Sequence, residues 1–216
     1  MKAYFMTEIP KFIVVFFVTA AVSFAGSLQL GAVNLTVLQT TLRQNRRAGI
    51  WVAVGGCLPE LGYAAMAIWA ANWLGQYPAV WQLIGWLAGL VLLALGIITY
   101  NTPNQPLPNA SQKNVDNPFA KGLILGLLNP QLFPYWLVIL VQFGNYDFLR
   151  VETRPQQAAF VAGTAAGALV LLVALARLAH RRREWLLGIL GQTNTNKWLG
   201  VLFGLLALGQ FLKMAF

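Results

Sequence analysis

Charged side chains are scarce in this sequence. Only 10% of its 216 residues are Asp, Glu, Lys or Arg, whereas 58% are hydrophobic and the mean hydropathy is +0.62. A typical soluble domain carries about 25% charged residues. The scarcity therefore excludes a chain built mainly of soluble domains and indicates an integral membrane protein.

Residue types that carry redox and metal chemistry are equally scarce. Cys57 is the only cysteine and His180 the only histidine. A lone thiol forms no intrachain disulfide, and one histidine among arginines is a poor metal site. The sequence also has no GxSxG, P-loop or HExxH motif and no carboxylate cluster, so nothing in it supports an enzyme or an ATP-driven pump. We expect no catalytic residue, no metal and no cofactor.

Six long apolar windows are present instead. A helix needs about 20 mostly apolar residues to cross a bilayer core. The windows lie at residues 12–34 (running on to 42), 48–73, 78–100, 119–143, 156–179 and 198–216. They leave no sizeable soluble domain. We therefore predict a single all-α transmembrane domain over residues 1–216, with six transmembrane helices in the lipid bilayer.

The basic residues gather on one side of this predicted membrane protein. The net charge of +9 could suggest nucleic acid, but the charges lie in loops, where they set orientation, and we expect no nucleic-acid partner. The basic residues that follow the first, third and fifth windows are Arg43, Arg46, Arg47, Lys113, Lys121, Arg177, Arg181, Arg182, Arg183 and Lys197. Those at the termini and in the other loops are Lys2, Lys11, Arg150, Arg154 and Lys213. The positive-inside rule places the larger group in the cytoplasm and both termini outside.

One stretch of the sequence occurs twice. Residues 24–34, FAGSLQLGAVN, and residues 119–129, FAKGLILGLLN, agree at six of eleven positions. The copies lie three windows apart, so they must enter the membrane from opposite sides, as in transporters with inverted repeats. Chance or shared membrane composition is the alternative explanation. We predict two inverted three-helix repeats, 1–100 and 118–216, joined by a Pro- and Asn-rich cytoplasmic linker at 101–117.

Both copies contain a weak point for a helix. Pro130 and Pro134 remove two backbone donors, which we expect to leave the carbonyls of Gly126 and Pro130 without helical partners. The first segment has only Gly31 and Asn34 at the matching place. As one straight helix its apolar run is about 46 Å long, against about 30 Å for the hydrocarbon core. It must tilt strongly or break near Gly31, so we predict that the first and fourth helices are kinked or broken.

Glu60 is the only ionisable side chain well inside a predicted span. A charge at that depth costs a few kcal/mol, so an intramembrane carboxylate is a functional candidate by default. The alternative is a protonated Glu that only hydrogen-bonds a neighbouring helix. Burial favours the neutral carboxyl, which can then gain and lose a proton as a site alternates between the two sides. Small residues flank it at helical spacing, namely Gly49, Ala53, Gly56 and Ala64.

Glycines four residues apart recur elsewhere in the apolar windows. Gly163 and Gly167 form one such pair, and Gly200 and Gly204 form another. Small residues at this spacing let two helices approach closely. They suit a homodimer interface as well as packing within one chain, and the sequence leaves both open.

The sequence resembles the lysine exporter (LysE/RhtB) family of small bacterial efflux carriers. LGAVNLTVLQTTLRQNRRAGIWVAVGG resembles the family's Pro-Gly-Pro segment, its basic turn and its Gly-rich second helix. FAKGLILGLLNPQLFPYW resembles the family's Asn-Pro segment, with Asn129 and Pro130 intact. The Pro-Gly-Pro motif falls on Leu30, Gly31 and Ala32, so only its glycine is present.

The resemblance implies proton-driven export of amino acids or similar small metabolites through the bacterial cytoplasmic (inner) membrane. From the residues we add a mechanism. Unwound segments at Gly31 to Asn34 and at Gly126 to Pro130, including Asn129, would present half-helix N-termini to the substrate carboxylate. Glu60 would hold the ammonium group or a proton. Competition between the two at Glu60 would couple their opposite movements, which is antiport.

A second reading belongs to a different class. The chain lacks two of the three Pro-Gly-Pro residues, and a fold does not by itself establish a function. A non-transporting membrane scaffold or assembly protein that retains the transporter fold is the alternative.

Overall fold

The structure is a computed structural model that describes residues 10–28, 31–74, 78–101, 116–129 and 131–181, together with 197, 200, 201, 204, 205, 207–209, 211 and 212. Within these residues every regular element is a helix, which confirms the all-α class for this part of the chain. The helices are α1 (Lys11–Gly26), α2 (Ala32–Arg43), α3 (Arg46–Leu74), α4 (Pro78–Asn101), α5 (Pro118–Leu127), α6 (Leu132–Phe143) and α7 (Arg154–Arg181). Pro130, residues 102–115 of the linker and most of the sixth window lie outside the described residues.

The described helices match the predicted windows in position, but not all of them in length. By length and apolar composition, α3 and α7 can each cross a membrane, and the bent pair α5 and α6 qualifies if it counts as one span. The first segment divides into two shorter helices, of which α1 is apolar. The count of six spans and the division into two inverted repeats therefore stay predictions.

The first segment breaks at the glycine singled out in the sequence. α1 ends at Gly26, and α2 begins after Gly31, whose backbone is extended. The side-chain amide of Asn34 donates a 2.7 Å hydrogen bond to the carbonyl of Ser27 across the break. That carbonyl follows the last turn of α1, where backbone acceptors have no partner within the helix. The predicted interruption is confirmed, and no proline is needed to make it.

The fourth segment also breaks at its predicted place. α5 ends at Leu127 and α6 begins at Leu132, and their axes differ by 62°. The side-chain oxygen of Asn129 accepts a 3.1 Å hydrogen bond from the backbone N–H of Gln131, as in an Asx turn. One expectation was wrong, because the Gly126 carbonyl does have a partner. The N–H of Asn129 donates to it at 3.2 Å, three residues on, where Pro130 has no N–H to donate four residues on.

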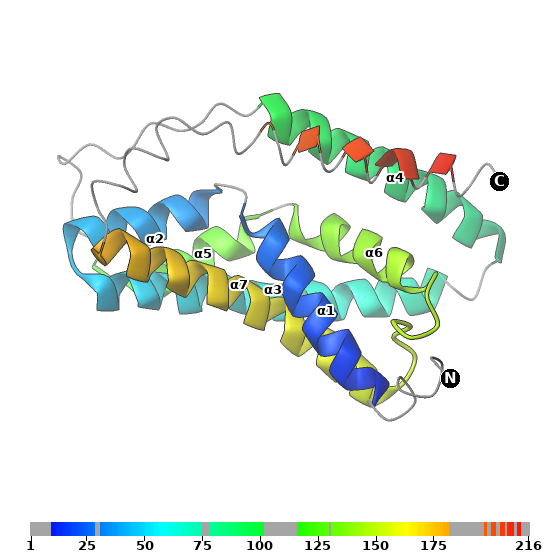
Figure 1. Ribbon diagram of the computed structural model, residues 1–216, viewed down its shortest axis with the longest axis horizontal. Coiled ribbons are helices and arrows are strands. Elements are labelled where there is room, and N and C mark those ends of the chain that lie inside the picture. The colour runs from blue at the N-terminus through cyan, green and yellow to red at the C-terminus, as the bar shows by residue number, and fades with distance from the viewer. Residues whose placement is uncertain are drawn as a thin grey trace, which may run out of the picture.

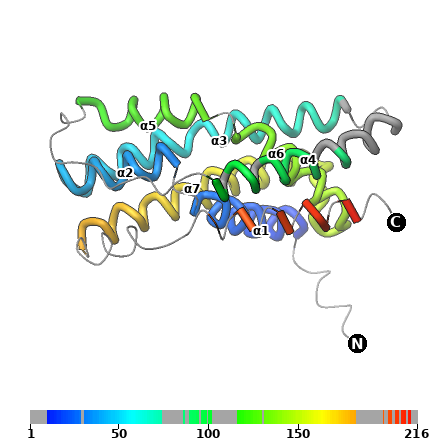
Figure 2. Tube along the Cα trace, turned by 90° about the horizontal axis from the view of Figure 1, so that it is seen from above, coloured from blue at the N-terminus to red at the C-terminus, as the bar shows by residue number. Residues whose placement is uncertain are grey.

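The two broken segments run in opposite directions along the long helix α3. Figure 1 shows α2 and α5 towards one end of α3 and α1 and α6 towards the other, and Figure 2 shows the same helices from above. Each broken segment packs against the long helix of the other half of the chain, α1 against α7 and α5 against α3. Since each break separates two halves at opposite ends, both breaks lie beside the middle of α3.

Glycines bring these helix pairs into backbone contact. A methyl group on Gly122 would meet the Val52 carbonyl and lie 3.0 Å from the backbone nitrogen of Gly56, so α5 lies directly on α3. A methyl group on Gly163 would lie 2.8 Å from the Phe16 carbonyl oxygen, so α1 lies equally close to α7. Small residues are what close helix packing in a membrane requires. At these positions the glycines serve packing within the chain.

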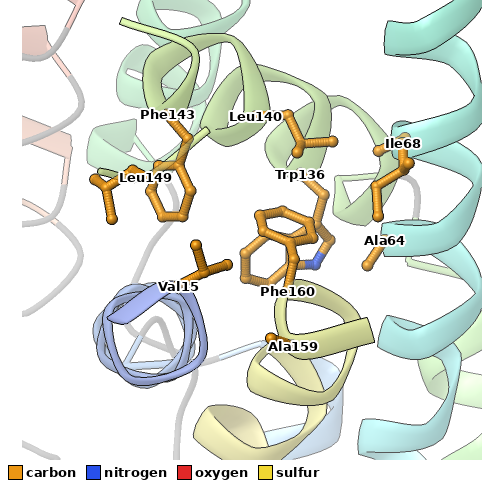
Figure 3. Packing of buried hydrophobic residues seen from close by; sticks show 10 residues of the cluster. Val15, Ala64, Ile68, Trp136, Leu140, Phe143, Leu149, Ala159 and Phe160 are labelled. Atoms are coloured by element: carbon orange, nitrogen blue, oxygen red, sulfur yellow. The ribbon is translucent and has the colours of Figure 1, made fainter. Parts of the chain in front are cut away.

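Buried apolar side chains form two main clusters between the helices. The larger joins the start of α1, the second half of α3, α6 and the start of α7, and Figure 3 shows Trp136, Phe143 and Phe160 among its members. The other joins α2, the first half of α3 and the second half of α7 around Val37, Val52 and Leu172. α4 is more peripheral and packs on α6 through Leu92 and Val138.

Candidate functional site

Glu60 lies at the middle of α3, where it meets the end of α1. Its side chain is only 7% exposed. The Ser23 hydroxyl, in the last turns of α1, lies 3.3 Å from Oε2 of Glu60. The same hydroxyl donates a 2.6 Å hydrogen bond to the carbonyl of Thr164 in α7. Three helices thus meet at Ser23, just before the first break.

The second break lies against the same turn of α3. A methyl group on Gly126 would lie 2.8 Å from Cγ of Pro59, the residue before Glu60. One turn further on, the Tyr63 hydroxyl donates a 2.7 Å hydrogen bond to the carbonyl of Leu127, the last residue of α5. The end of α5 is therefore held on both sides of Glu60.

Tyr135 connects the two breaks to each other. It belongs to the first turn of α6, and its hydroxyl donates a 3.1 Å hydrogen bond to the carbonyl of Val22 in α1. A methyl group on Gly26, the last residue of α1, would collide with the same hydroxyl. The start of α6 and the end of α1 are thus in contact, and the four helix ends created by the breaks gather around one region of α3.

The structure brings together most of the residues predicted for the site. Glu60, Gly126 and Asn34 are buried, Asn129 is partly buried and Gly31 is exposed. The start of α2 reaches α3 one turn before Glu60, where a methyl group on Gly56 would meet Val33. In the described contacts, the two asparagines hold the breaks through Ser27 and Gln131. Pro130 lies outside the described residues.

Four residues of this region are not found by reasoning from the sequence. They are Ser23, Tyr63, Tyr135 and Thr164. Hydroxyl groups are common in apolar helices, so they carry little signal on their own. The one signal in the sequence was the glycine pair at 163 and 167, on either side of Thr164. Such a pair marks where another helix can approach α7 closely, which lets the Ser23 hydroxyl reach the backbone of α7.

Two apolar layers enclose Glu60 along α3. The aromatic cluster of Figure 3 begins at Ala64, one turn after Glu60, and contains the edge-to-face pair Trp136 and Phe160. The aliphatic cluster ends at Ala53, two turns before Glu60. A carboxyl group held between such layers is shielded from water on both sides and is suited to holding a proton or one compact cation. Within the described residues, no three His, Cys, Asp or Glu side chains are grouped as a metal site needs.

Comparison with known proteins gives a match to a family model. The model of the LysE type translocator family matches residues 24–213. The uncharacterized membrane protein YahN of Escherichia coli (strain K12) is 28% identical over 114 residues, which make up 50% of this chain and 51% of that protein. The alignment therefore spans about half the length of this curated relative. No solved structure gives a significant match.

Proposed function

Because the chain belongs to the LysE type translocator family, we propose that it is a secondary active exporter of amino acids or similar small metabolites that exchanges substrate for protons at Glu60. The observation that carries this proposal is the meeting of both helix breaks beside one buried carboxyl. Ser23 joins the first break to Glu60, and Gly126 packs the second break against Pro59. Broken helices around a midplane site are the arrangement that secondary transporters use to bind small solutes.

The helix ends at the breaks suit the charged groups of an amino acid. Gly31 precedes α2, and the start of α2 carries no side-chain cap, which leaves backbone N–H groups for a carboxylate. The start of α6 has fewer to offer, because Asn129 accepts from the N–H of Gln131 and Pro134 has no N–H. Ionised Glu60 would hold the ammonium group. When a proton takes its place at Glu60 the ammonium group is released, so substrate and proton move in opposite directions. A single buried acid favours a neutral amino acid over a cationic one.

The opposite directions of the two broken segments support two inverted three-helix repeats. The exchange of long-helix partners, α1 with α7 and α5 with α3, is what a two-fold axis relating the halves would produce. On this proposal the protein lies in the bacterial cytoplasmic membrane, with the linker in the cytoplasm and both termini outside. A homodimer would have to use faces other than those of Gly122 and Gly163, because these glycines already pack inside the chain.

Exchange measured in proteoliposomes tests the role of Glu60. Glu60→Gln keeps the shape of the side chain but cannot release a proton, so we expect substrate exchange that no longer responds to an imposed pH gradient. Glu152→Gln is the matched control, because Glu152 is exposed in the loop before α7. Proton-coupled export that survives in Glu60→Gln at the wild-type rate would overturn the proposal.

A growth screen identifies the substrate class. Cells with and without overexpression are challenged with toxic amino acids and their analogues, and we expect overexpression of the wild type, but not of Glu60→Gln, to protect against a subset. No protection across a broad panel would favour the scaffold reading.

A further inference from the structure

Ser23 carries one hydroxyl proton but faces two acceptors. The Thr164 carbonyl lies 2.6 Å from its oxygen, and Oε2 of Glu60 lies 3.3 Å away. Hydroxyl hydrogen bonds are typically about 2.7 to 2.8 Å long, so the shorter contact takes the proton. A backbone carbonyl has no proton to offer in return. Towards Glu60, Ser23 therefore presents an oxygen lone pair.

We infer that Glu60 is protonated in this conformation and donates to Ser23, and that Ser23 is the positioning residue which links the protonation of Glu60 to the contact between α1 and α7. An ionised carboxylate would face the lone pair of Ser23 with no proton between the two oxygens, an arrangement that is repulsive in a shielded site. A protonated carboxyl completes a chain from Glu60 through Ser23 to Thr164. The inference rests on the proposed function, which makes Glu60 the proton site.

No other described group near Glu60 supplies a compensating charge. The described charged residues of the helices packed on α3 include Lys11 in α1, Arg43 in α2 and Lys121 in α5, and those of α7 are Arg154, Arg177, His180 and Arg181. All lie towards helix ends away from the breaks, and the described part of α6 has none. The other titratable groups described in this region are the Cys57 thiol and the Tyr63 hydroxyl, each one turn from Glu60 on α3, and the Tyr135 hydroxyl on α6, and all three are uncharged when protonated.

Loss of the Glu60 proton would change the acceptor of the Ser23 hydroxyl. An ionised Glu60 is the stronger acceptor, because a hydrogen bond to a charged group is roughly twice as strong as a neutral one. Ser23 would then donate to Glu60 and leave the Thr164 carbonyl, which keeps its own partner within α7. The end of α1 would be tied to α3 instead of α7. Since Gly26 and the first break follow Ser23 directly, deprotonation would change the contacts of the segment that has to move.

Infrared difference spectroscopy on the purified wild-type protein tests the proton. At neutral pH we expect the carbonyl band of a protonated carboxyl group, absent from Glu60→Gln. In Ser23→Ala the band should shift to higher frequency, because the carboxyl loses its acceptor. Thr19→Ala is the matched control: Thr19 lies one turn earlier on α1, also against α7, and its buried hydroxyl has no partner among the described residues. It should leave the band unchanged.

The pH profile of exchange provides a second readout. Ser23→Ala removes a charge-assisted donor from ionised Glu60 and only a neutral bond from the protonated form, so half-maximal exchange should move by roughly one pH unit to more alkaline pH. A wild-type profile and band in Ser23→Ala would overturn the inference, as would a wild-type protein without the band. Neither result would bear on the proposed function, which is tested separately by proton coupling in Glu60→Gln and by the growth screen.

Discussion

Tyr63 of α3 and Leu127 of α5 are joined by a 2.7 Å hydrogen bond from the tyrosine hydroxyl to the leucine carbonyl. Leu127 ends its helix, so its carbonyl has no acceptor role within α5. At the first break, Tyr135 donates to the carbonyl of Val22, one turn before α1 ends. At each break, a tyrosine from a neighbouring helix thus hydrogen-bonds the helix that ends there and holds it in the bundle.

Removing either hydroxyl should loosen its break. We expect Tyr63→Phe and Tyr135→Phe each to lower the free energy of unfolding by about 1 kcal/mol, the net contribution of one hydrogen bond. Thermal unfolding of the detergent-solubilised protein measures this. Tyr100→Phe is the control, since Tyr100 is 45% exposed at the end of α4. Equal melting temperatures for all three variants would show that the tyrosines do not hold the breaks.

Gly122 and Gly62 should respond in opposite ways to the same added methyl group. Gly122→Ala would drive Cβ into the backbone of α3 at Val52, whereas a methyl on Gly62 meets nothing within 4 Å. We expect Gly122→Ala to lose about 1 to 3 kcal/mol of stability through overpacking. Gly62→Ala should gain up to about 1 kcal/mol from its better helix propensity. Unfolding midpoints of the two variants decide the matter, and destabilisation by both would contradict the packing described for α3 and α5.

Trp136 is expected to be the most costly aromatic side chain to remove. It is 1% exposed, and its indole N–H has no partner among the described residues. Trp136→Ala should cost about 3 to 5 kcal/mol, as large buried side chains do. Trp136→Phe should cost much less, because it keeps a ring against Phe160 and removes an unsatisfied donor. Trp69→Ala, at a position that is 72% exposed, is the control in the same unfolding measurement. Equal costs for Trp136→Ala and Trp69→Ala would contradict the assignment of Trp136 to the core.

The sequence was sufficient to locate the described helices and both breaks. Long apolar windows can fold only as helices in a membrane, and the excess length of the first one left tilting or breaking as the two options. Gly31 and Asn34 then marked the weak point, because glycine tolerates an extended backbone and asparagine can hydrogen-bond a local carbonyl. The intramembrane cost of a charge singled out Glu60 for the same kind of physical reason.

The hydrogen-bond partners of Glu60 could not be predicted from the sequence in this way. Ser23 and Thr164 are separated from it by 37 and 104 positions along the chain, and which of the many buried hydroxyls faces an acid depends on how helices rotate about their axes. The Gly126 carbonyl shows a second limit. Proline rules predict which donor is missing, but the three-residue turn that supplies the Asn129 N–H follows from the path of the chain after the break.

The predicted orientation places the loop before α7 outside and the start of α3 in the cytoplasm. Arg47 and Glu152 are exposed on these two sides, which makes them suitable positions for a single cysteine. Each single cysteine is introduced in a Cys57→Ala background, which removes the buried native thiol. A maleimide that cannot cross membranes should label Glu152→Cys in intact spheroplasts and Arg47→Cys only after lysis. The reverse pattern would invert the predicted topology. Labelling of both cysteines in intact spheroplasts would exclude a single orientation. The excess of basic residues after the first, third and fifth windows would then need an explanation other than the positive-inside rule.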